Sequence, residues 1–179
     1  MKLCVVDESD VTPALDAAIR DGLIESFPAD RDAFAKARPW HGSAPSYSIV
    51  ADEGDRVIAH AGVVDRTVTV GRTPLRVAGV QNVFVRPTHR GTGLVDRVMS
   101  LAMDEARRRG FDMGLLFCIP RLVPVYARTD WKTLGEQDVI RIDETGTEAP
   151  IPGKNETMFY PLKVSTFPPG RIHLRGNDW

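Results

Sequence analysis

Hydrophobic and polar positions change their period along the chain, and each change marks an expected element. An apolar run at residues 2–7 predicts a short strand. Apolar residues then recur at helical spacing from 15 to 27, directly after Thr12 and Pro13, a pair typical of a helix start. The stretch 29–45 mixes charges, aromatic residues and prolines, which predicts a loop or a broken helix.

A period of two begins at residue 47, where three β-rich runs are separated by DEGD and GRTP turns. This pattern predicts an antiparallel meander over residues 47–85. An amphipathic helix is expected at 94–109 with Gly110 as its cap, and an apolar strand at 111–118. Strand, helix and strand in this order imply a right-handed parallel crossover.

The remaining sequence predicts a short helix around Tyr126, strands within 131–142 and 156–162, and an extended tail at 167–179. The fold class is therefore α+β or mixed α/β, with one central twisted mixed sheet of about six to seven strands flanked by helices. We expect one domain over residues 1–179, because this length suits a single well-filled core.

Composition narrows the classes of partner. The formal net charge is −1, so no global field attracts nucleic acid or an anionic membrane, and neither is an expected partner. Cys4 and Cys118 cannot form a disulfide framework, which fits a reducing compartment. Without a signal-like segment or a long apolar run, a soluble cytoplasmic protein is expected. The histidines and cysteines show no metal-ligand spacing, so no metal is predicted.

The segment RGTG at residues 90–93 lies between the third meander strand and the amphipathic helix. A helix N-terminus carries unpaired N–H groups and favours anions, and glycines let the backbone approach a ligand closely. Arg90 adds a fixed cation. A phosphate site and a plain tight connection both fit this loop from the residues alone.

The stretch PTHRGTGLVDRVMSLAMDEARRRG resembles the acyl-CoA-binding motif of the GNAT N-acetyltransferases, R/Q-x-x-G-x-G/A, read here as Arg90-x-x-Gly93-x-Val95. Val95 departs from the small residue at the last position. The order of elements over about residues 47 to 135 also resembles this family, which implies a GNAT fold. Residues 56–94 and the GNDW ending resemble the aminoglycoside 2′-N-acetyltransferases. The WHGSAPSYSIVADEG and FPPGRIHLRGN segments resemble the nodulation acyltransferase NodA.

The resemblance implies acetyl-CoA, or another acyl-CoA, as co-substrate and a small-molecule amine as acceptor. The pantetheine arm would pair with one strand and the pyrophosphate would sit on the loop. The residues implied for the coenzyme are Val83, Phe84, Val85, Arg90, Gly91, Thr92, Gly93, Leu94 and Val95.

Direct attack of an amine on a thioester needs a base, an oxyanion donor and an acid. Tyr126 matches the family's tyrosine near the coenzyme sulfur and is assigned the acid role. A glutamate of the aminoglycoside enzymes aligns with Gln81, which cannot take a proton. Three other groups could be the base: the terminal carboxylate of Trp179, Asp178 and His60. The terminus could instead be frayed, and His60 could instead be a core residue with its hydrogen bonds satisfied.

Acceptor specificity is expected in residues 29–47 and in the tail. Asp30, Asp32 and Asp178 could receive ammonium groups, and Trp40 with His41 could stack against a sugar ring; solvated or structural roles are the alternatives. An acyl-cysteine at Cys118 is disfavoured, because no base is spaced to activate it.

Three hypotheses stay open at this point. The first is an acetyl-CoA-dependent N-acetyltransferase for an amino sugar or an aminoglycoside-like amine. The others are a NodA-like enzyme with a longer acyl chain, delivered by CoA or an acyl carrier protein, and a non-catalytic module that binds CoA. The family is often dimeric, and a homodimer is an open option, although no exposed apolar stripe marks an interface.

Overall fold

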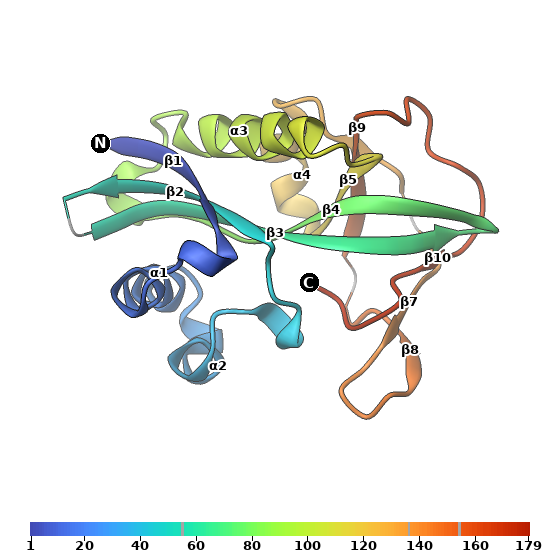
Figure 1. Cartoon of the computed structure of the whole chain (residues 1–179), viewed down its shortest axis with the longest axis horizontal. Coiled ribbons are helices and arrows are strands. Elements are labelled where there is room, and N and C mark those ends of the chain that lie inside the picture. Colours follow the sequence, from blue (N-terminus) through green and yellow to red (C-terminus); the bar gives the residue numbers. More distant parts are fainter. Residues whose placement is uncertain (55, 136, 154) are drawn as a thin grey trace.

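A computed structural model describes residues 1–54, 56–135, 137–153 and 155–179. One mixed sheet has helices on both faces: α3 lies over one face, and α1 and α2 lie against the other (Figure 1). This confirms the predicted mixed α/β class. The strands are β1 (Lys2–Asp7), β2 (Tyr47–Glu53), β3 (Arg56–Val70), β4 (Thr73–Val85), β5 (Met113–Cys118), β6 (Lys132–Thr133), β7 (Val139–Ile142), β8 (Glu148–Pro150), β9 (Glu156–Pro161) and β10 (Ile172–His173). The helices are α1 (Pro13–Ser26), α2 (Arg31–Lys36), α3 (Leu94–Arg108) and α4 (Val123–Ala127).

The long strand β3 organises the sheet. It pairs antiparallel with β2 and with β4, and β1 extends the sheet beyond β2. On the other side, β4 pairs parallel with β5, and β5 pairs antiparallel with β9. The far end of β3 pairs with β10, which continues through β7 to β8. Within the described residues the sheet has ten strands, more than predicted, because several short strands near the end of the chain pair as well.

The N-terminal helices follow their sequence signals. Thr12 caps α1 by accepting a hydrogen bond from the Leu15 N–H (3.2 Å), and Pro13 occupies the first turn. The stretch predicted as a loop or broken helix forms 3₁₀ turns η2 (Pro28–Asp30) and η3 (Trp40–Gly42) around the short α2. Together these elements cover the face of the sheet opposite to α3.

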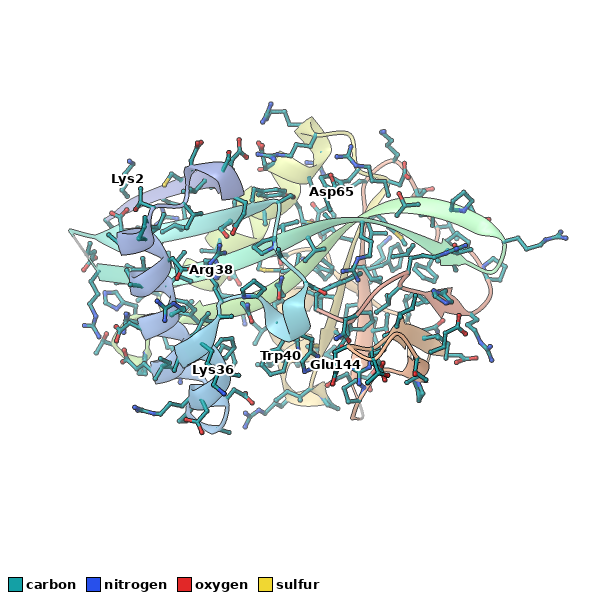
Figure 2. The ribbon with its side chains drawn as sticks, turned by 60° about the horizontal axis from the view of Figure 1, so that its bottom comes forward. Lys2, Lys36, Arg38, Trp40, Asp65 and Glu144 are labelled. Carbon is teal, nitrogen blue, oxygen red and sulfur yellow. The ribbon has the colours of Figure 1, made fainter. Side chains whose placement is uncertain are left out.

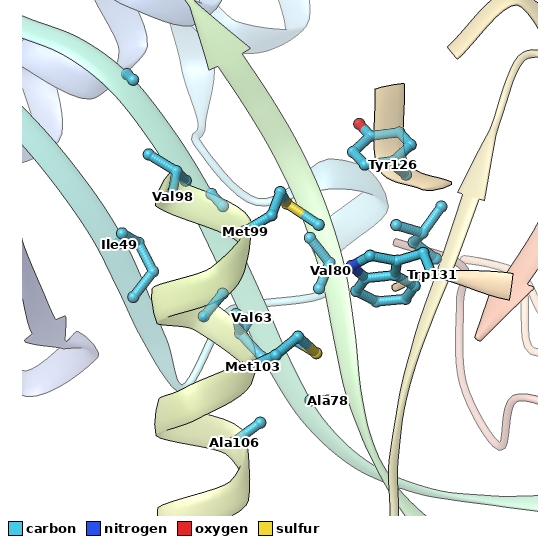
Figure 3. Packing of buried hydrophobic residues seen from close by; sticks show 14 of the residues in the cluster. Ile49, Val63, Ala78, Val80, Val98, Met99, Met103, Ala106, Tyr126 and Trp131 are labelled. Atoms are coloured by element: carbon cyan, nitrogen blue, oxygen red, sulfur yellow. The ribbon is translucent and has the colours of Figure 1, made fainter. Parts of the chain in front are cut away.

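The amphipathic helix α3 buries a continuous stripe against the sheet. Val98, Met99 and Met103 face strand residues such as Ile49 and Val80 (Figure 3). Each fully buried side chain of this size contributes roughly 1.5–3 kcal/mol.

The end of α3 is also as predicted. Gly110 has φ +76, which confirms it as the residue that ends the helix. Glu105 lies on the same helix and accepts hydrogen bonds from Arg108 and Arg109, each at 2.5 Å. The bond with Arg108 is the main cause that lowers the pKa of Glu105.

The carboxyl-terminal third differs most from the expectation. The predicted strand over 131–142 is divided into β6 and β7, and position 136 lies outside the described residues. The strand β8 was not predicted, and the extended tail contains the two-residue strand β10. Among the described helices, none combines the length and the apolar character needed to cross a membrane.

Candidate active site

A cleft opens where β4 and β5 separate. The two strands pair only through residues 77–79 and 113–115, and beyond this point they diverge around a space of about 1120 Å³. From Val80 onward, the described part of the chain leaves β4 without a neighbouring strand on its β5 side. An unpaired strand edge can bind an extended ligand through its backbone groups.

A β-bulge lies in β4 at the same level. His60 pairs with Phe84 and Gly62 pairs with Gln81, so two residues of β4 face one residue of β3. Within the bulge, Asn82 adopts a left-handed conformation with φ +54. The sequence alone could not reveal this bulge, because a left-handed asparagine leaves no mark on the hydrophobic period.

Buried polar groups hold the bulge in place. The carbonyl of Asn82 accepts a hydrogen bond from His60 Nδ1 (2.9 Å), and its amide donates to the carbonyl of Arg38 (2.8 Å). His60 Nε2 lies 3.1 Å from the hydroxyl of Ser48. Since a carbonyl only accepts, Nδ1 carries the proton and Nε2 accepts from Ser48.

His60 is therefore a satisfied core residue. Burial lowers its pKa to about 4, the hydrogen bond to Asn82 opposes this shift, and the charge of Arg38 adds to it. Both ring nitrogens have partners, and His60 is not among the residues that line the cleft. This is the core-histidine alternative that the sequence left open.

The loop before α3 is open and has the features of an anion site. Gly91 and Gly93 have φ +79 and +74, and neither has a heavy atom near the place of a Cβ. Gly93 is the N-cap of α3 and supplies no side-chain hydrogen bond to the first turn. The N–H groups of that turn are thus free of a side-chain cap, and the helix dipole adds positive potential there.

Most residues predicted for the coenzyme lie in the cleft wall. Of the predicted residues, those that line the cleft are Val83, Phe84, Val85, Arg90, Gly91, Gly93, Leu94 and Val95. Thr92 does not line the cleft; its hydroxyl donates to the His89 carbonyl (2.7 Å) and closes the loop. Arg90 Nε donates to the Val85 carbonyl (3.1 Å), which ties the loop to β4.

A basic rim surrounds this end of the cleft, and we define it as His89, Arg90, Arg121 and Arg128. Arg128 pairs with Asp96 of the first turn of α3 at 2.8 Å. Arg121 makes no ion pair with a described residue. Arg121 and Arg128 are site residues that were not expected from the sequence; their position beside Tyr126 was the only available signal.

Tyr126 lies on α4 at the opposite wall of the cleft. Its ring packs near Met99 and Trp131, and its hydroxyl makes no hydrogen bond to another described residue (Figure 3). Burial is the main cause that raises the pKa of Tyr126, and the neighbouring Cys118 adds to it. The hydroxyl is therefore protonated at neutral pH and free to donate.

Cys118 also lines the cleft, but as an unactivated thiol. Burial raises its pKa to about 11, and the charge of Glu156 acts in the same direction. Its sulfur contacts Met158 Sδ at 3.9 Å. Because the thiolate is the nucleophilic form, this environment disfavours an acyl-cysteine.

Gln81 positions the segment that contains η3. Its side-chain carbonyl accepts from the Trp40 N–H (3.0 Å), and its amide donates to the Ser43 carbonyl (2.5 Å). These bonds hold η3 beside the middle of the sheet, where Figure 2 shows Trp40. Trp40 belongs to an aromatic row with ring centroids 5.6 Å from Phe34 and 4.7 Å from His41.

The tail folds back over the sheet and lines the cleft. Trp179 is 5% exposed, and its ring lies on the α-carbon of Gly79. The Ser43 hydroxyl donates to the Asp178 carbonyl (2.8 Å), and Arg66 donates to the Asn177 carbonyl (2.5 Å). The alternative of a frayed terminus is therefore wrong.

The predicted acceptor residues divide between two places. Asp30, Trp40 and Asp178 line the cleft together with Gln81, Tyr126 and Trp179. Asp32 is exposed on α2 and is not among the lining residues. Asp178 Oδ1 lies 2.8 Å from Arg141 Nη1 and 2.9 Å from His41 Nδ1.

Comparisons with known proteins agree with this geometry. The family model described as "Acetyltransferase (GNAT) domain" matches residues 18–134. An aminoglycoside 2′-N-acetyltransferase of Mycolicibacterium fortuitum is 32% identical over 124 residues, which make up 67% of this chain and 61% of that protein. The chain therefore spans less than two thirds of the length of this curated relative.

Solved structures share the fold across nearly the whole chain. The GNAT family N-acetyltransferase YhbS of Escherichia coli, crystallised with CoA, has a TM-score of 0.66 at 19% identity, covering 98% of this chain and 91% of that one. A GNAT family acetyltransferase of Brucella melitensis in complex with acetyl-CoA has a TM-score of 0.57 at 18% identity, with 96% and 94% covered. The chain belongs to the GNAT acetyltransferase family.

Proposed function

We propose that the chain is an N-acetyltransferase that moves the acetyl group of acetyl-CoA to a primary amine of an amino sugar or an aminoglycoside-like molecule. One observation carries the proposal: a single cleft joins the uncapped start of α3, the unpaired edge of β4 and the hydroxyl of Tyr126. A pyrophosphate, an extended arm and a thioester require these groups in this order.

The residues around the donor end fit a coenzyme of this kind. The first-turn N–H groups of α3 and the loop at Gly91 and Gly93 would bind the pyrophosphate. The N-cap gives that turn no side-chain hydrogen bond, and no described atom lies within 4 Å of the Cβ positions of the two glycines. The backbone of β4 from Val83 to Val85 would hydrogen-bond the pantetheine amides as a neighbouring strand does. The arginines of the basic rim would balance the remaining phosphate charge.

The bulge at Asn82 supports the chemistry. It turns the peptide groups of β4 out of the ladder, so a backbone N–H near Val83 is available to the thioester carbonyl. Such a donor stabilises the negative charge that grows on oxygen when the amine attacks. His60 and Arg38 keep this donor fixed before the substrate binds.

Tyr126 would act as the general acid. As the C–N bond forms and the C–S bond breaks, its hydroxyl gives a proton to the departing thiolate. The proton that leaves the amine passes to water or to a carboxylate beside the acceptor. The role of Trp179 as this base stays a prediction. Gln81 cannot take a proton, and its hydrogen bonds support a positioning role through η3.

The basic rim also supports a second candidate, a NodA-like transfer of a longer acyl chain from an acidic acyl carrier protein. Rim residues on the surface could receive an acidic partner as well as the phosphates of CoA. The two candidates differ in the donor that the enzyme uses.

A thiol-release assay decides between these functions. Acetyl-CoA, longer acyl-CoAs and an acylated carrier protein are each offered with a panel of primary amines. The proposal predicts turnover with acetyl-CoA and an amino-bearing acceptor, and a mass increase of one acetyl group on the amine. Preference for a long chain on the carrier would favour the second candidate. Coenzyme binding without release of thiol for any amine would refute both and favour a non-catalytic module.

A further inference from the structure

The carboxylates of the cleft wall, from the start of α3 to the tail, differ in whether a cation already pairs with them. Three carboxylate side chains line the cleft, on Asp30, Asp96 and Asp178. Asp96 is paired with Arg128 and Asp178 with Arg141, each at 2.8 Å. Asp30 makes no ion pair with any described residue. One carboxylate side chain of the described cleft wall is thus uncompensated, whereas a polycationic acceptor needs several.

The cation that pairs with Asp178 lies outside the cleft. Arg141 belongs to β7 and reaches the tail from behind; Nη1 donates both to Asp178 Oδ1 and to Asn177 Oδ1, each at 2.8 Å. Arg141 itself does not line the cleft, and its Nε is buried without a hydrogen-bond partner among the described residues. Arg66, which donates to the Asn177 carbonyl, adds a second cation to the same end.

A neutralised Asp178 can still recognise an acceptor. Both contacts fall on Oδ1, and Oδ2 makes no hydrogen bond to a described residue. This oxygen can accept from a neutral hydroxyl without requiring a second ammonium group. Trp40, in the aromatic row that ends at His41 beside Asp178, lines the cleft and gives it an apolar wall that a ring can contact.

We propose that Arg141, by neutralising Asp178, makes the enzyme select ring-bearing acceptors with a single ammonium group, such as monoamino sugars, over polycationic aminoglycosides. This inference rests on the proposed N-acetyltransferase function and narrows its acceptor class. Each further ammonium group would enter a space where Arg141 already balances Asp178 and only Asp30 among the described carboxylate side chains of the cleft wall is left unpaired. Repulsion between the additional ammonium groups and the arginine would disfavour binding of a polycationic acceptor.

The test compares kcat/KM for glucosamine with kcat/KM for kanamycin and tobramycin, using acetyl-CoA as donor. The wild-type enzyme is expected to prefer glucosamine. Arg141→Met removes the cation and keeps the length of the side chain, so the ratio of kanamycin to glucosamine should rise by about tenfold. Arg141→Lys keeps the charge and should keep the wild-type ratio.

Arg171→Met is the matched control, because Arg171 pairs with the exposed Asp138 and lies outside the cleft wall. It makes the same change in net charge and should leave the ratio as in the wild type. Equal ratios in Arg141→Met and Arg171→Met would overturn the inference. A wild-type preference for kanamycin would overturn it without any variant. Transfer to no amine, with coenzyme still bound, would instead refute the proposed function.

Discussion

The indole of Trp179 lies on Gly79 so closely that a Cβ at position 79 would be 2.4 Å from the ring atom Cε2. Gly79 is the last residue of β4 that pairs with β5 before the strands diverge. The tail can pack here only because residue 79 has no side chain. This contact joins the tail to the centre of the sheet, at the point where the cleft begins.

Replacing Gly79 by alanine should displace the ring and loosen the tail. We expect the KM for the acceptor to rise while the KM for acetyl-CoA changes little, and the free energy of unfolding to fall by about 1–3 kcal/mol. Steady-state kinetics and urea denaturation measure both. In a Trp179→Ala background the same substitution should cost less, because the collision is gone; fully additive losses in this double-mutant cycle would contradict the contact.

Replacing Tyr126 by phenylalanine should slow acyl transfer by about a hundredfold or more, since the departing thiolate loses its proton donor. Affinity for acetyl-CoA, measured by calorimetry, should stay near the wild-type value. Tyr160→Phe is the control, because Tyr160 lies on β9 outside the cleft wall. An unchanged kcat in Tyr126→Phe would remove the acid role from this residue.

The bulge predicts an unusual ranking of substitutions at Asn82. Glycine adopts φ +54 without strain, whereas alanine pays roughly 1–2 kcal/mol for it. Both variants lose the side-chain hydrogen bond to the Arg38 carbonyl. The difference between their free energies of unfolding therefore reports on the left-handed conformation at position 82. Asn82→Gly should therefore be the more stable of the two in chemical denaturation. An alanine variant of equal stability would mean that the left-handed bulge is not required.

The buried His60 predicts an acid-side loss of stability. Its pKa is about 4 in the folded chain against an ordinary 6.5, so the unfolded state takes up a proton first as the pH falls. This contribution is complete above pH 6.5 and is lost between pH 6.5 and 4, by up to about 3 kcal/mol.

Denaturation curves over this pH range measure the loss. A His60→Gln variant should show a shallower fall, because glutamine does not titrate. Carboxylates titrate in both proteins, so the difference between the two slopes reports on His60 alone. Parallel slopes would show that the ring is not buried in its neutral form.

Local signals made one wall of the cleft predictable, the wall formed by β4, the glycine loop and α3. The meander, α3 and the glycine loop are adjacent in sequence, and their periods, caps and turns are properties of neighbouring residues. The acceptor side is built differently. Gln81 holds Trp40 from 41 positions away, and Arg141 reaches Asp178 from a separate strand. No period or spacing encodes such contacts.

The left-handed Asn82 shows the same limit at a single residue. Its conformation is fixed by His60 and Arg38, which are remote along the chain, and not by its neighbours. The strand count failed for a related reason. Short strands such as β8 and β10 exist through pairing with distant partners and have little intrinsic pattern of their own.

Ser43 and Asp178 close the acceptor end across 135 positions of sequence. Contacts of such separation form late in folding, after the local meander and α3. Segments at a chain terminus also open before the central strands of a sheet in the native state. Amide exchange should therefore be faster in the tail than in β3 and β4. When the tail opens locally, the proposed amine pocket should be lost while the proposed pocket for the acyl donor stays folded. The amine would then reach an enzyme already loaded with its donor.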